Sequence, residues 1–395
     1  MGTFSKAKKA LQMAKHFLCL RDENGKKYRK SVMLYGFYGM NLGDDLFFDK
    51  LLTRYPDTLF IVHQPAWYRR FFNKYQNVKF FASEERMVQK INRLGNKFHI
   101  RELFELLLLW RGNATVHIGG SIYQQVDFYL LDYSLRKRRK QPFKPFFSIS
   151  CNFGAFHSDD FLKLWRTQFL RYRDVCFRDR FSYDLFSDVK SVRYAPDLLF
   201  SFQYPKLPQE DGSVCISVLD PFIPQRKIPT DCAEAYCKAL ARTVTDLVQN
   251  GKTVRLLGFC TFEGDDRAIQ RILAETPPDI AARTEVLLYD FDHRDEMLNA
   301  LASCEYVIGT RLHAVILGLC LGKKVLPLLY NDKIRYILSD LNYSQPTLDF
   351  SQFGAYAETG LRPVLQGIKP FDVSAVSDSD AKQFARLDKF LKKKS

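Results

Sequence analysis

Short apolar runs alternate with longer amphipathic segments along most of the chain. In the first half, this pattern predicts strands over residues 31–37, 58–64, 114–120, 146–154, 174–180 and 191–197, with a helix near residues 44–55. In the second half, it predicts strands over residues 213–220, 253–259, 284–290, 306–310 and 324–330, with helices near residues 232–250, 265–275, 294–303 and 312–321. Strands that alternate with helices are typical of a parallel sheet covered by helices on both faces.

The residues between the two halves divide the chain. Residues 201–212 (SFQYPKLPQEDG) contain two prolines and a glycine with little periodicity, which is typical of a linker. We therefore predict an α/β protein with two doubly wound, Rossmann-like domains that face each other across a cleft. The first domain is expected over residues 30–200 and the second over residues 213–378. The remaining segment, residues 379–395, is expected to form a last helix that returns to the first domain, followed by a basic tail.

The charge of the chain points to anionic partners. Its 395 residues are 46% hydrophobic and 26% charged, a globular composition, and they carry a formal net charge of +15. This balance favours nucleic acid, acidic lipid or phosphorylated substrates. The basic runs at residues 136–140 and 392–394 accompany no recognisable nucleic-acid module, so we predict no nucleic-acid partner and favour a membrane-facing or solvated basic patch.

Residues 1–29 form a basic appendage with two interpretations. Apolar residues near helical spacing are interleaved there with lysines: Phe4, Leu11, Ala14, Phe17 and Leu18. The segment is either a helix on an acidic membrane surface or a helix docked on its own domain with a solvated basic face. The chain shows no apolar run of roughly 20 residues and no signal-peptide pattern. We therefore expect a cytoplasmic protein, with a peripheral position at the inner membrane face as a further hypothesis.

The nine cysteines are scattered and form no CxxC motif. They predict neither a disulfide framework nor a zinc site, and no other cluster of side chains has metal-ligand spacing. We predict that no metal site and no cofactor are needed.

Two glycine-containing loops follow predicted strands of the first domain. The first, residues 36–45 (GFYGMNLGDD), opens a helix and supplies the candidates Asn41, Gly43, Asp44 and Asp45. Glycine lets a ligand approach the backbone, and short polar side chains suit sugar hydroxyls. The alternative is that Asn41 or Asp44 only caps the helix. The second loop, residues 117–121, supplies Gly119 and Gly120 at the same edge of the sheet, where open α/β sheets bind ligands.

Polar groups that suit an anion follow three further predicted strands. Arg178 ends the strand at 174–180, Arg311 and His313 lie where the strand at 306–310 gives way to a helix, and Lys333 follows the strand at 324–330. Arginines, a helix N-terminus and an imidazole together would bind an anion beside a titratable proton. The alternatives are an Arg178–Asp179 pair that orders its loop and a histidine that only covers a helix start.

These segments, taken together, resemble the polysaccharide pyruvyl transferase family. Five match in order: GFYGMNLGDD, HIGGS, FRDRFSYDLF, YAPDLLF and GTRLHAVILGLCLGKKVLPLLYNDK. The loop HIGGS has two glycines where the family often has three, and residues 73–110 have no family pattern.

The resemblance implies a transferase that moves the pyruvyl group of phosphoenolpyruvate onto two hydroxyls of a sugar. The product is a cyclic pyruvate ketal with release of phosphate, in the synthesis of capsule or other surface glycans. The architecture is expected to be GT-B-like, with the acceptor at the first domain and phosphoenolpyruvate at the second. His313 would be catalytic, and Arg178, Arg311 and Lys333 would bind phosphoenolpyruvate. The loop candidates would contact the acceptor, which we expect to be linked to polyprenyl diphosphate.

Two other functions remain open on the sequence. One is a GT-B glycosyltransferase that uses a nucleotide sugar, although no acidic segment for the donor ribose is evident. The other is a non-catalytic member that binds glycans, which the joint presence of Arg178, His313 and Lys333 disfavours.

Overall fold

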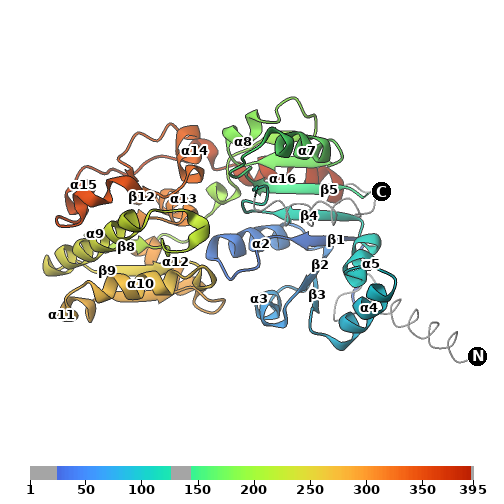
Figure 1. The fold of residues 1–395 in the computed structure, drawn as a ribbon, viewed down its shortest axis with the longest axis horizontal. Helices are drawn as coiled ribbons and strands as arrows, with labels where there is room; N and C mark the ends of the chain where they lie inside the picture. Colours follow the sequence, from blue (N-terminus) through green and yellow to red (C-terminus); the bar gives the residue numbers. More distant parts are fainter. Residues whose placement is uncertain (1–24, 126–143, 393–395) are drawn as a thin grey trace, which may run out of the picture.

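Two parallel sheets face each other in the structure, a computed structural model that describes residues 25–125 and 144–392 (Figure 1). The predicted α/β class with two doubly wound domains is thereby confirmed. Most of the basic appendage at residues 1–29, the run at 136–140 and the end of the basic tail lie outside the described residues.

The first sheet has seven parallel strands in the order β3-β2-β1-β4-β5-β6-β7. They are β1 (Lys30–Tyr35), β2 (Thr58–Gln64), β3 (Val78–Ala82), β4 (Ala114–Ile118), β5 (Phe146–Cys151), β6 (Asp174–Phe177) and β7 (Val192–Tyr194). Side chains of β1 alternate between its two faces. Val32 and Leu34 pack with helix α2 (Leu42–Arg54), whereas Met33 packs with helix α5 (Leu103–Arg111). Burial on both faces explains why residues 32–34 of this strand are all apolar.

The second sheet repeats the same winding with six parallel strands in the order β10-β9-β8-β11-β12-β13. They are β8 (Val214–Ser217), β9 (Val254–Gly258), β10 (Glu285–Leu288), β11 (Tyr306–Gly309), β12 (Lys324–Leu329) and β13 (Leu348–Asp349). Helices cover it, among them α9 (Thr230–Gln249), α10 (Asp265–Ala274), α12 (Arg294–Ser303), α13 (Leu312–Cys320) and α14 (Asp332–Asp340). In each sheet the strand order reverses beside the first strand, between β1 and β4 and between β8 and β11. Such a reversal leaves a crevice at the carboxyl ends of the strands.

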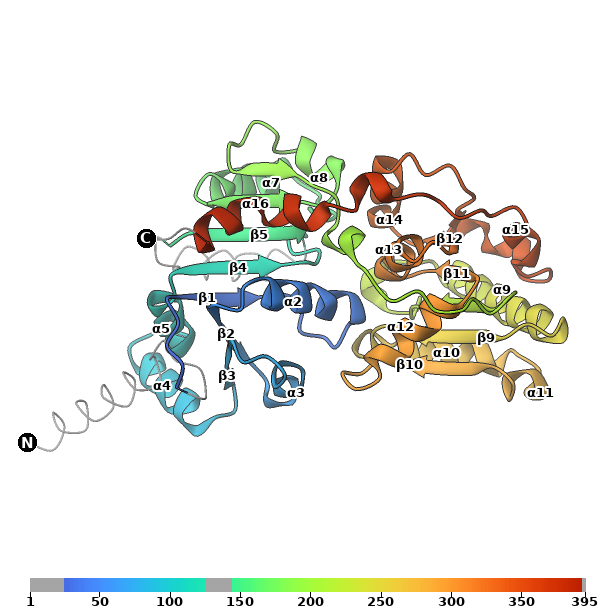
Figure 2. The same ribbon diagram turned by 180° about the vertical axis from the view of Figure 1, so that it is seen from behind.

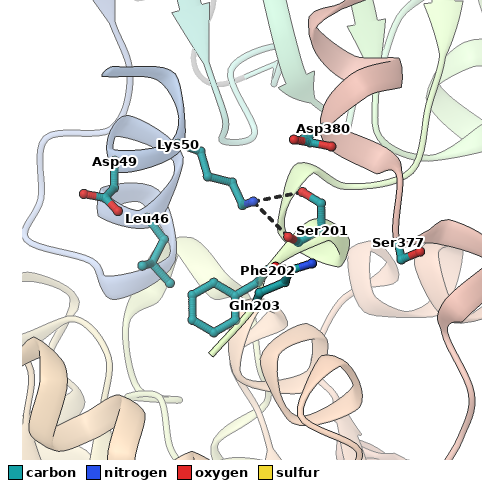
Figure 3. A pocket seen from close by; sticks show the side chains of 8 residues that line it. All are labelled: Leu46, Asp49, Lys50, Ser201, Phe202, Gln203, Ser377 and Asp380. Carbon is teal, nitrogen blue, oxygen red and sulfur yellow. Dashed lines mark hydrogen bonds between the residues drawn. The ribbon is translucent and has the colours of Figure 1, made fainter. Parts of the chain in front are cut away.

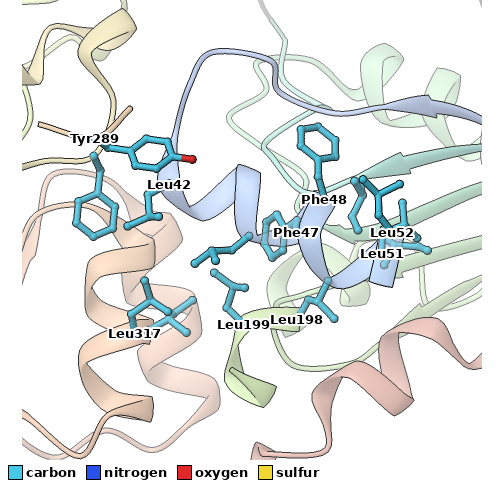
Figure 4. Packing of buried hydrophobic residues seen from close by; sticks show 14 of the residues in the cluster. Leu42, Phe47, Phe48, Leu51, Leu52, Leu198, Leu199, Tyr289 and Leu317 are labelled. Carbon is cyan, nitrogen blue, oxygen red and sulfur yellow. The ribbon is translucent and has the colours of Figure 1, made fainter. Parts of the chain in front are cut away.

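The two domains share one hydrophobic cluster (Figure 4). Leu42 and Phe47 of α2 and Leu199 of the first domain lie in the same cluster as Leu317 of α13 and Tyr289 after β10. The backbone joins the domains at this place too, because the Leu42 N–H donates to the Phe259 carbonyl at 3.1 Å. The start of α2 is therefore held between the two sheets.

Helix α16 (Ser379–Leu391) crosses back from the second domain and lies along β5 of the first (Figure 2). Its Gln383 amide donates to the carbonyls of Ala195 and Pro196 at 2.8 and 2.9 Å, and accepts from the Ser150 N–H at 2.9 Å. Its Phe384 is buried in the shared cluster. The chain thus passes twice between the domains, once before β8 and once before α16.

No helix in the described part of the chain is both long and apolar enough to span a lipid bilayer. The apolar run at residues 103–110 lies in the nine-residue helix α5.

Asp45 joins the two domains through buried hydrogen bonds. The Tyr289 hydroxyl of the second domain donates to Oδ2 of Asp45 at 2.7 Å, and the Tyr68 hydroxyl donates to Oδ1. We expect Tyr289→Phe to lower the free energy of unfolding by about 1–2 kcal/mol, because one buried oxygen loses its partner. Urea denaturation would measure this change. Tyr204→Phe is the matched control, since its hydroxyl makes an exposed bond to Asn299 at 2.8 Å. Equal stability of the two variants would contradict the prediction.

Candidate active site

The carboxyl ends of strands from both sheets meet at one pocket of about 450 Å³. Residues of both domains line it: Gly36, Phe37, Asn41, Asp44, His117, Gly120, Ser121, Ile122, Gln124, Arg178, Phe259, Glu263, Arg311, Leu312, His313, Tyr330 and Lys333. Arg178, His313 and Lys333, which are far apart in the sequence, therefore converge as the sequence predicts. Arg178 belongs to the first domain and the other two to the second, so the cationic end of the pocket is built by both domains together.

Arg178 is buried at the end of β6, and three partners fix its guanidinium. Nη1 donates to Asp197 at 3.0 Å and approaches Nε2 of His313 at 3.3 Å, while Nη2 donates to Asn152 at 2.8 Å. The Nε atom of Arg178 is buried and has no hydrogen-bond partner among the described residues. This arrangement replaces the predicted alternative of an Arg178–Asp179 loop pair, because Asp179 instead caps α8 (Arg180–Asp184) by accepting from the Ser182 N–H at 2.7 Å.

His313 lies in the first turn of α13 and is 8% exposed. Its ring meets Phe47 edge to face at a centroid distance of 5.0 Å. A Cβ atom at Gly43 would lie 1.7 Å from Nδ1 of His313, so glycine at residue 43 is what allows the imidazole to rest on α2. Gly43 thus positions the histidine rather than contacting a ligand.

The surroundings of His313 favour the neutral form of its imidazole. Burial lowers its pKa well below the usual value, and the nearby charges of Arg178, Arg311 and Lys333 lower it further. Since an arginine can only donate, Nε2 of the neutral ring accepts from Arg178 and Nδ1 carries the proton. An anion bound among these cations would act in the opposite direction and raise the pKa of His313.

Lys333 reaches the pocket from the start of α14. Asn331 caps that helix by accepting from the Lys333 N–H at 3.1 Å. The ammonium group forms no ion pair with any residue that the structure describes. Burial lowers the pKa of Lys333, and the neighbouring Arg178 lowers it too, while Tyr330, Glu263 and Asp44 oppose the shift. Lys333 is therefore a cation whose charge is not neutralised by a direct partner.

Arg311 lines the pocket, but its charge is already matched. Its Nε donates to Asp265 at 3.1 Å, and its terminal nitrogens are paired with Glu263 and Asp265. Burial opposes the charged form, yet the pKa of Arg311 is raised because both carboxylates stabilise it. Glu263 after β9 and Asp265 at the start of α10 thus supply two counter-charges to Arg311, and its predicted contact with phosphoenolpyruvate stays a prediction.

Asn41 and Asp44 both line the pocket, with different local roles. Asn41 caps α2 by accepting from the Gly43 N–H at 3.1 Å, so it is a cap as well as a lining residue. Asp44 does not cap, and its Oδ1 is buried without a hydrogen-bond partner among the described residues. Burial raises the pKa of Asp44 to about 7, with Arg178 as the main opposing charge. Asp44 is therefore a carboxyl group that titrates near neutral pH inside the pocket.

Asp45 does not belong to the pocket, which corrects its assignment as an acceptor contact. Successive residues of a helix point about 100° apart, so Asp44 faces the pocket while Asp45 faces the contact between the domains. There it accepts from Tyr68 and Tyr289, and burial raises its pKa to about 8. Its role is structural.

The second glycine loop contributes one residue to the pocket and one to its support. Gly119 and Gly120 have φ angles of 70° and 79°, a region that favours glycine. Gly120 lines the pocket. Gly119 does not, because it lies behind Asp44 against the ring of Phe47, where a Cβ atom would come within 2.3 Å.

Glu263 lines the pocket, and Asn152 and Asp197 bind Arg178, yet none of the three was singled out from the sequence. Asn152 follows a bulge in β5, where Ser150 has a φ of 53°, and this bulge turns the chain toward Arg178. Asp197 and Glu263 also follow strands, after β7 and β9. The available signal was their position near carboxyl ends of strands, since Asn152 and Asp197 lie in the last residues of two predicted strands and Glu263 lies in the loop after a third.

A second pocket, of about 380 Å³, lies where the chain passes twice between the domains (Figure 3). Lys50 of α2 points to Ser201 there and donates to its carbonyl and hydroxyl oxygens at 3.0 and 2.9 Å. Ser377, just before α16, lies on the opposite wall. None of the strand-end residues converges on this pocket. No group of three or more His, Cys, Asp or Glu side chains in residues 25–125 and 144–392 has the geometry of a metal site.

Solved structures share this two-domain architecture. HepE from Anabaena, solved in complex with UDP and glucose, aligns with a TM-score of 0.50 and 12% identity over 91% of this chain and 95% of that chain. A putative UDP-N-acetylglucosamine 2-epimerase from Listeria monocytogenes aligns with a TM-score of 0.53 and 8% identity over 93% of this chain and 98% of that chain. At these identities the likeness concerns the fold, which is GT-B-like as predicted.

The sequence itself matches the model of one protein family, described as polysaccharide pyruvyl transferase, over residues 41–332. This match runs from the start of α2 to the start of α14, and therefore includes Arg178, Arg311 and His313. Because it spans well over half of the 395 residues, the chain belongs to the polysaccharide pyruvyl transferase family.

Proposed function

We propose that the protein transfers the pyruvyl group of phosphoenolpyruvate to two hydroxyls of one sugar, forming a cyclic ketal and releasing phosphate in surface-glycan synthesis. The observation that carries this proposal is the convergence of Arg178, His313 and Lys333 on one pocket between the domains. Such a set suits a small ligand with several negative charges and a carbon that must be protonated.

The donor is placed at the cationic end of the pocket. Phosphoenolpyruvate carries a carboxylate and a phosphate, so at least two cationic groups must face it. Arg178, with its unpartnered Nε, and Lys333, without an ion pair, are the groups that can supply them. In this proposal Arg311 mainly holds the wall of the pocket through Glu263 and Asp265. The requirement for cations is thus met by side chains, and no metal or cofactor is invoked.

The reaction needs a proton at the methylene carbon of the donor. His313 gives this proton as the general acid, and the methylene becomes the methyl group of the ketal. The bound carboxylate and phosphate supply the negative charge that keeps the imidazole protonated, against the lowering effect of burial and Arg178. A hydroxyl of the sugar then forms a bond to the adjacent carbon, and a second hydroxyl displaces phosphate from it.

The two hydroxyls each lose a proton as they react. Asp44 is placed to accept one of them, since its pKa of about 7 lies near the working pH of a cytoplasmic enzyme. Overall, one hydroxyl proton replaces the proton that His313 gives to the methyl group, and the other leaves with the phosphate. Asn41 and the backbone at Gly120 lie in the same pocket and would hold the sugar.

The acceptor is proposed to be a sugar on a polyprenyl diphosphate carrier. Phosphoenolpyruvate is a cytoplasmic metabolite, and surface glycans are commonly assembled on such carriers at the inner face of the membrane. This places the reaction in the cytoplasm beside that face.

Donor use distinguishes the proposal from its alternatives. The full chain is incubated with phosphoenolpyruvate and candidate lipid-linked or soluble acceptors, and mass spectrometry of the acceptor is compared with release of inorganic phosphate. We expect ketal and phosphate in equal amounts, with or without EDTA. Release of UDP from a UDP-sugar, without use of phosphoenolpyruvate, would instead indicate a glycosyltransferase. Glycan binding without either reaction would indicate a non-catalytic member, and loss of ketal formation in EDTA would show that a metal is needed.

A further inference from the structure

Helix α4 (Arg86–Lys97) carries two parallel stripes of opposite chemistry. Its cations recur at residues 86, 90, 93 and 97, and apolar side chains recur one position later at 87, 91, 94 and 98. Both spacings follow the turn of an α-helix, so each set lies along one line of the surface. No acidic residue occurs between residues 86 and 101, and Arg101 adds a fifth cation. The helix therefore presents a basic stripe beside an apolar one.

The apolar stripe is partly buried at its start and exposed to solvent at its end. Met87 and Ile91 are partly buried against the cluster that covers one face of the first sheet. Further along, Leu94 is 49% exposed and Phe98 is 68% exposed, and Ile100 in the following loop is 38% exposed. Three large apolar side chains are thus displayed within seven residues. Helix α4 lies at the end of the first domain that is farthest from the second domain (Figures 1 and 2).

The loop that displays these side chains is tightly built. The Phe98 and Ile100 N–H groups both donate to the Gly95 carbonyl, at 2.9 and 2.8 Å. His99 and Glu102 adopt left-handed backbone angles, with φ of 56° and 54°, which cost free energy in residues other than glycine. Gly95 is needed beneath the loop, because a Cβ atom there would lie 2.5 Å from the Ile100 carbonyl. A fixed loop loses little conformational entropy when its side chains enter a partner.

We propose that α4 and the loop to Arg101 form a docking surface for an anionic lipid bilayer, with Leu94, Phe98 and Ile100 entering the interface and the basic stripe facing the headgroups. Exposed apolar side chains beside a continuous row of cations are the two features that an interfacial helix needs. A second copy of the chain fits the surface poorly, because like-charged stripes would meet on molecules that each carry +15. The surface is separate from the pocket, and the proposal does not depend on the proposed reaction.

The test is sedimentation of the full chain with vesicles of phosphatidylcholine alone or mixed with phosphatidylglycerol. One variant combines Leu94→Ser, Phe98→Ser and Ile100→Ser, and another combines Lys90→Gln, Arg93→Gln and Lys97→Gln. Leu170→Ser, at a site 68% exposed elsewhere, is the control for the first variant. The combination Lys190→Gln, Lys206→Gln and Lys369→Gln is the control for the second, with the same change of charge at exposed sites. All altered side chains are at the surface, so circular dichroism should show an unchanged fold.

We expect binding to the anionic vesicles only, weakened by salt. Removing three cations from α4 should lower the partition coefficient by about a hundredfold, and removing the apolar side chains should lower it at least about tenfold, with both controls near wild type. Equal losses in the controls, or binding unchanged in both α4 variants, would overturn the proposal and would assign membrane affinity to net charge or another segment. Absence of binding by the wild type would also overturn it. So would a dimer in analytical ultracentrifugation that the apolar variant abolishes, since the surface would then join two copies.

Discussion

Replacing His313 with alanine is expected to lower the rate of ketal formation by about 10²–10⁴-fold. In the proposed reaction the imidazole delivers the proton that turns the methylene of phosphoenolpyruvate into a methyl group, and alanine has no group that can do so. The measurement is turnover followed by phosphate release and by mass spectrometry of the acceptor. Donor binding, followed by titration calorimetry, should change much less, because Arg178 and Lys333 remain.

His293→Ala is a suitable control for this variant. His293 also lies at the start of a helix, α12, but it is exposed and its ring is hydrogen-bonded to the neighbouring Asp290 at 2.9 Å. We expect its turnover to match the wild type. Near-normal turnover of His313→Ala would show that the proton comes from another group, and loss of folded structure would require the same comparison with His313→Gln.

Asp44→Asn is expected to lower turnover by a similar factor, about 10²–10⁴-fold, and to change the pH profile. A base must be ionised, so the activity of the wild type should rise as pH increases through about 7, the pKa that burial gives Asp44. The asparagine variant should lack this rise. The measurement is kcat against pH for both proteins. A rise through pH 7 that persists in Asp44→Asn would assign it to another group.

The same substitution should increase stability at high pH. Because the pKa of Asp44 is raised on folding, the folded state favours the protonated carboxyl. Its contribution to stability is therefore fully present below pH 4 and is lost as pH rises through 7. Asp44→Asn removes this loss, so its advantage over the wild type should grow between pH 5 and pH 8, by on the order of 2–4 kcal/mol. Asp57→Asn, at an exposed site, should show neither effect. A variant that loses both activity and stability at pH 8 would mean that Asp44 is structural.

The strands were predictable because a strand that is buried on both faces appears in the sequence as a short run of apolar residues. The prediction for β2 matches the structure at both ends, and β11 differs from its prediction by one residue. The region from Asn73 to Trp110 shows no family pattern and no element is predicted there, whereas the structure has β3, α4 and most of α5 in it. The apolar residues of α4 are partly buried at its start and exposed to solvent at its end. The hydrophobic pattern therefore differs from that of a helix packed against a core along its whole length.

The location of the site was predictable from the sequence, but the contacts between its side chains were less so. Parallel strands end at one edge, so Arg178, His313 and Lys333 could be expected together. The difference between Asp44 and Asp45 depends on how α2 is rotated against the second domain. The pairing of Arg311 with Asp265 depends on the loop after β9, which lies 46 residues earlier in the chain. Such contacts follow from packing between distant segments, which a local pattern does not contain.

Because α16 returns to the first domain, the first domain is synthesised before the second but needs residues made after the second. A ribosome makes every residue of the second domain before it makes residues 379–391. Until those residues emerge, β5 lacks the cover that Gln383 and Phe390 give it, and Phe147, whose ring lies 5.4 Å from that of Phe390, stays uncovered on the first domain. The first domain therefore cannot finish folding before the second domain has been synthesised, whereas N-terminal domains generally fold first. A protein truncated shortly before residue 379 would contain both sheets but would expose part of the hydrophobic core of its first domain. Chaperones and proteases would recognise this exposed core.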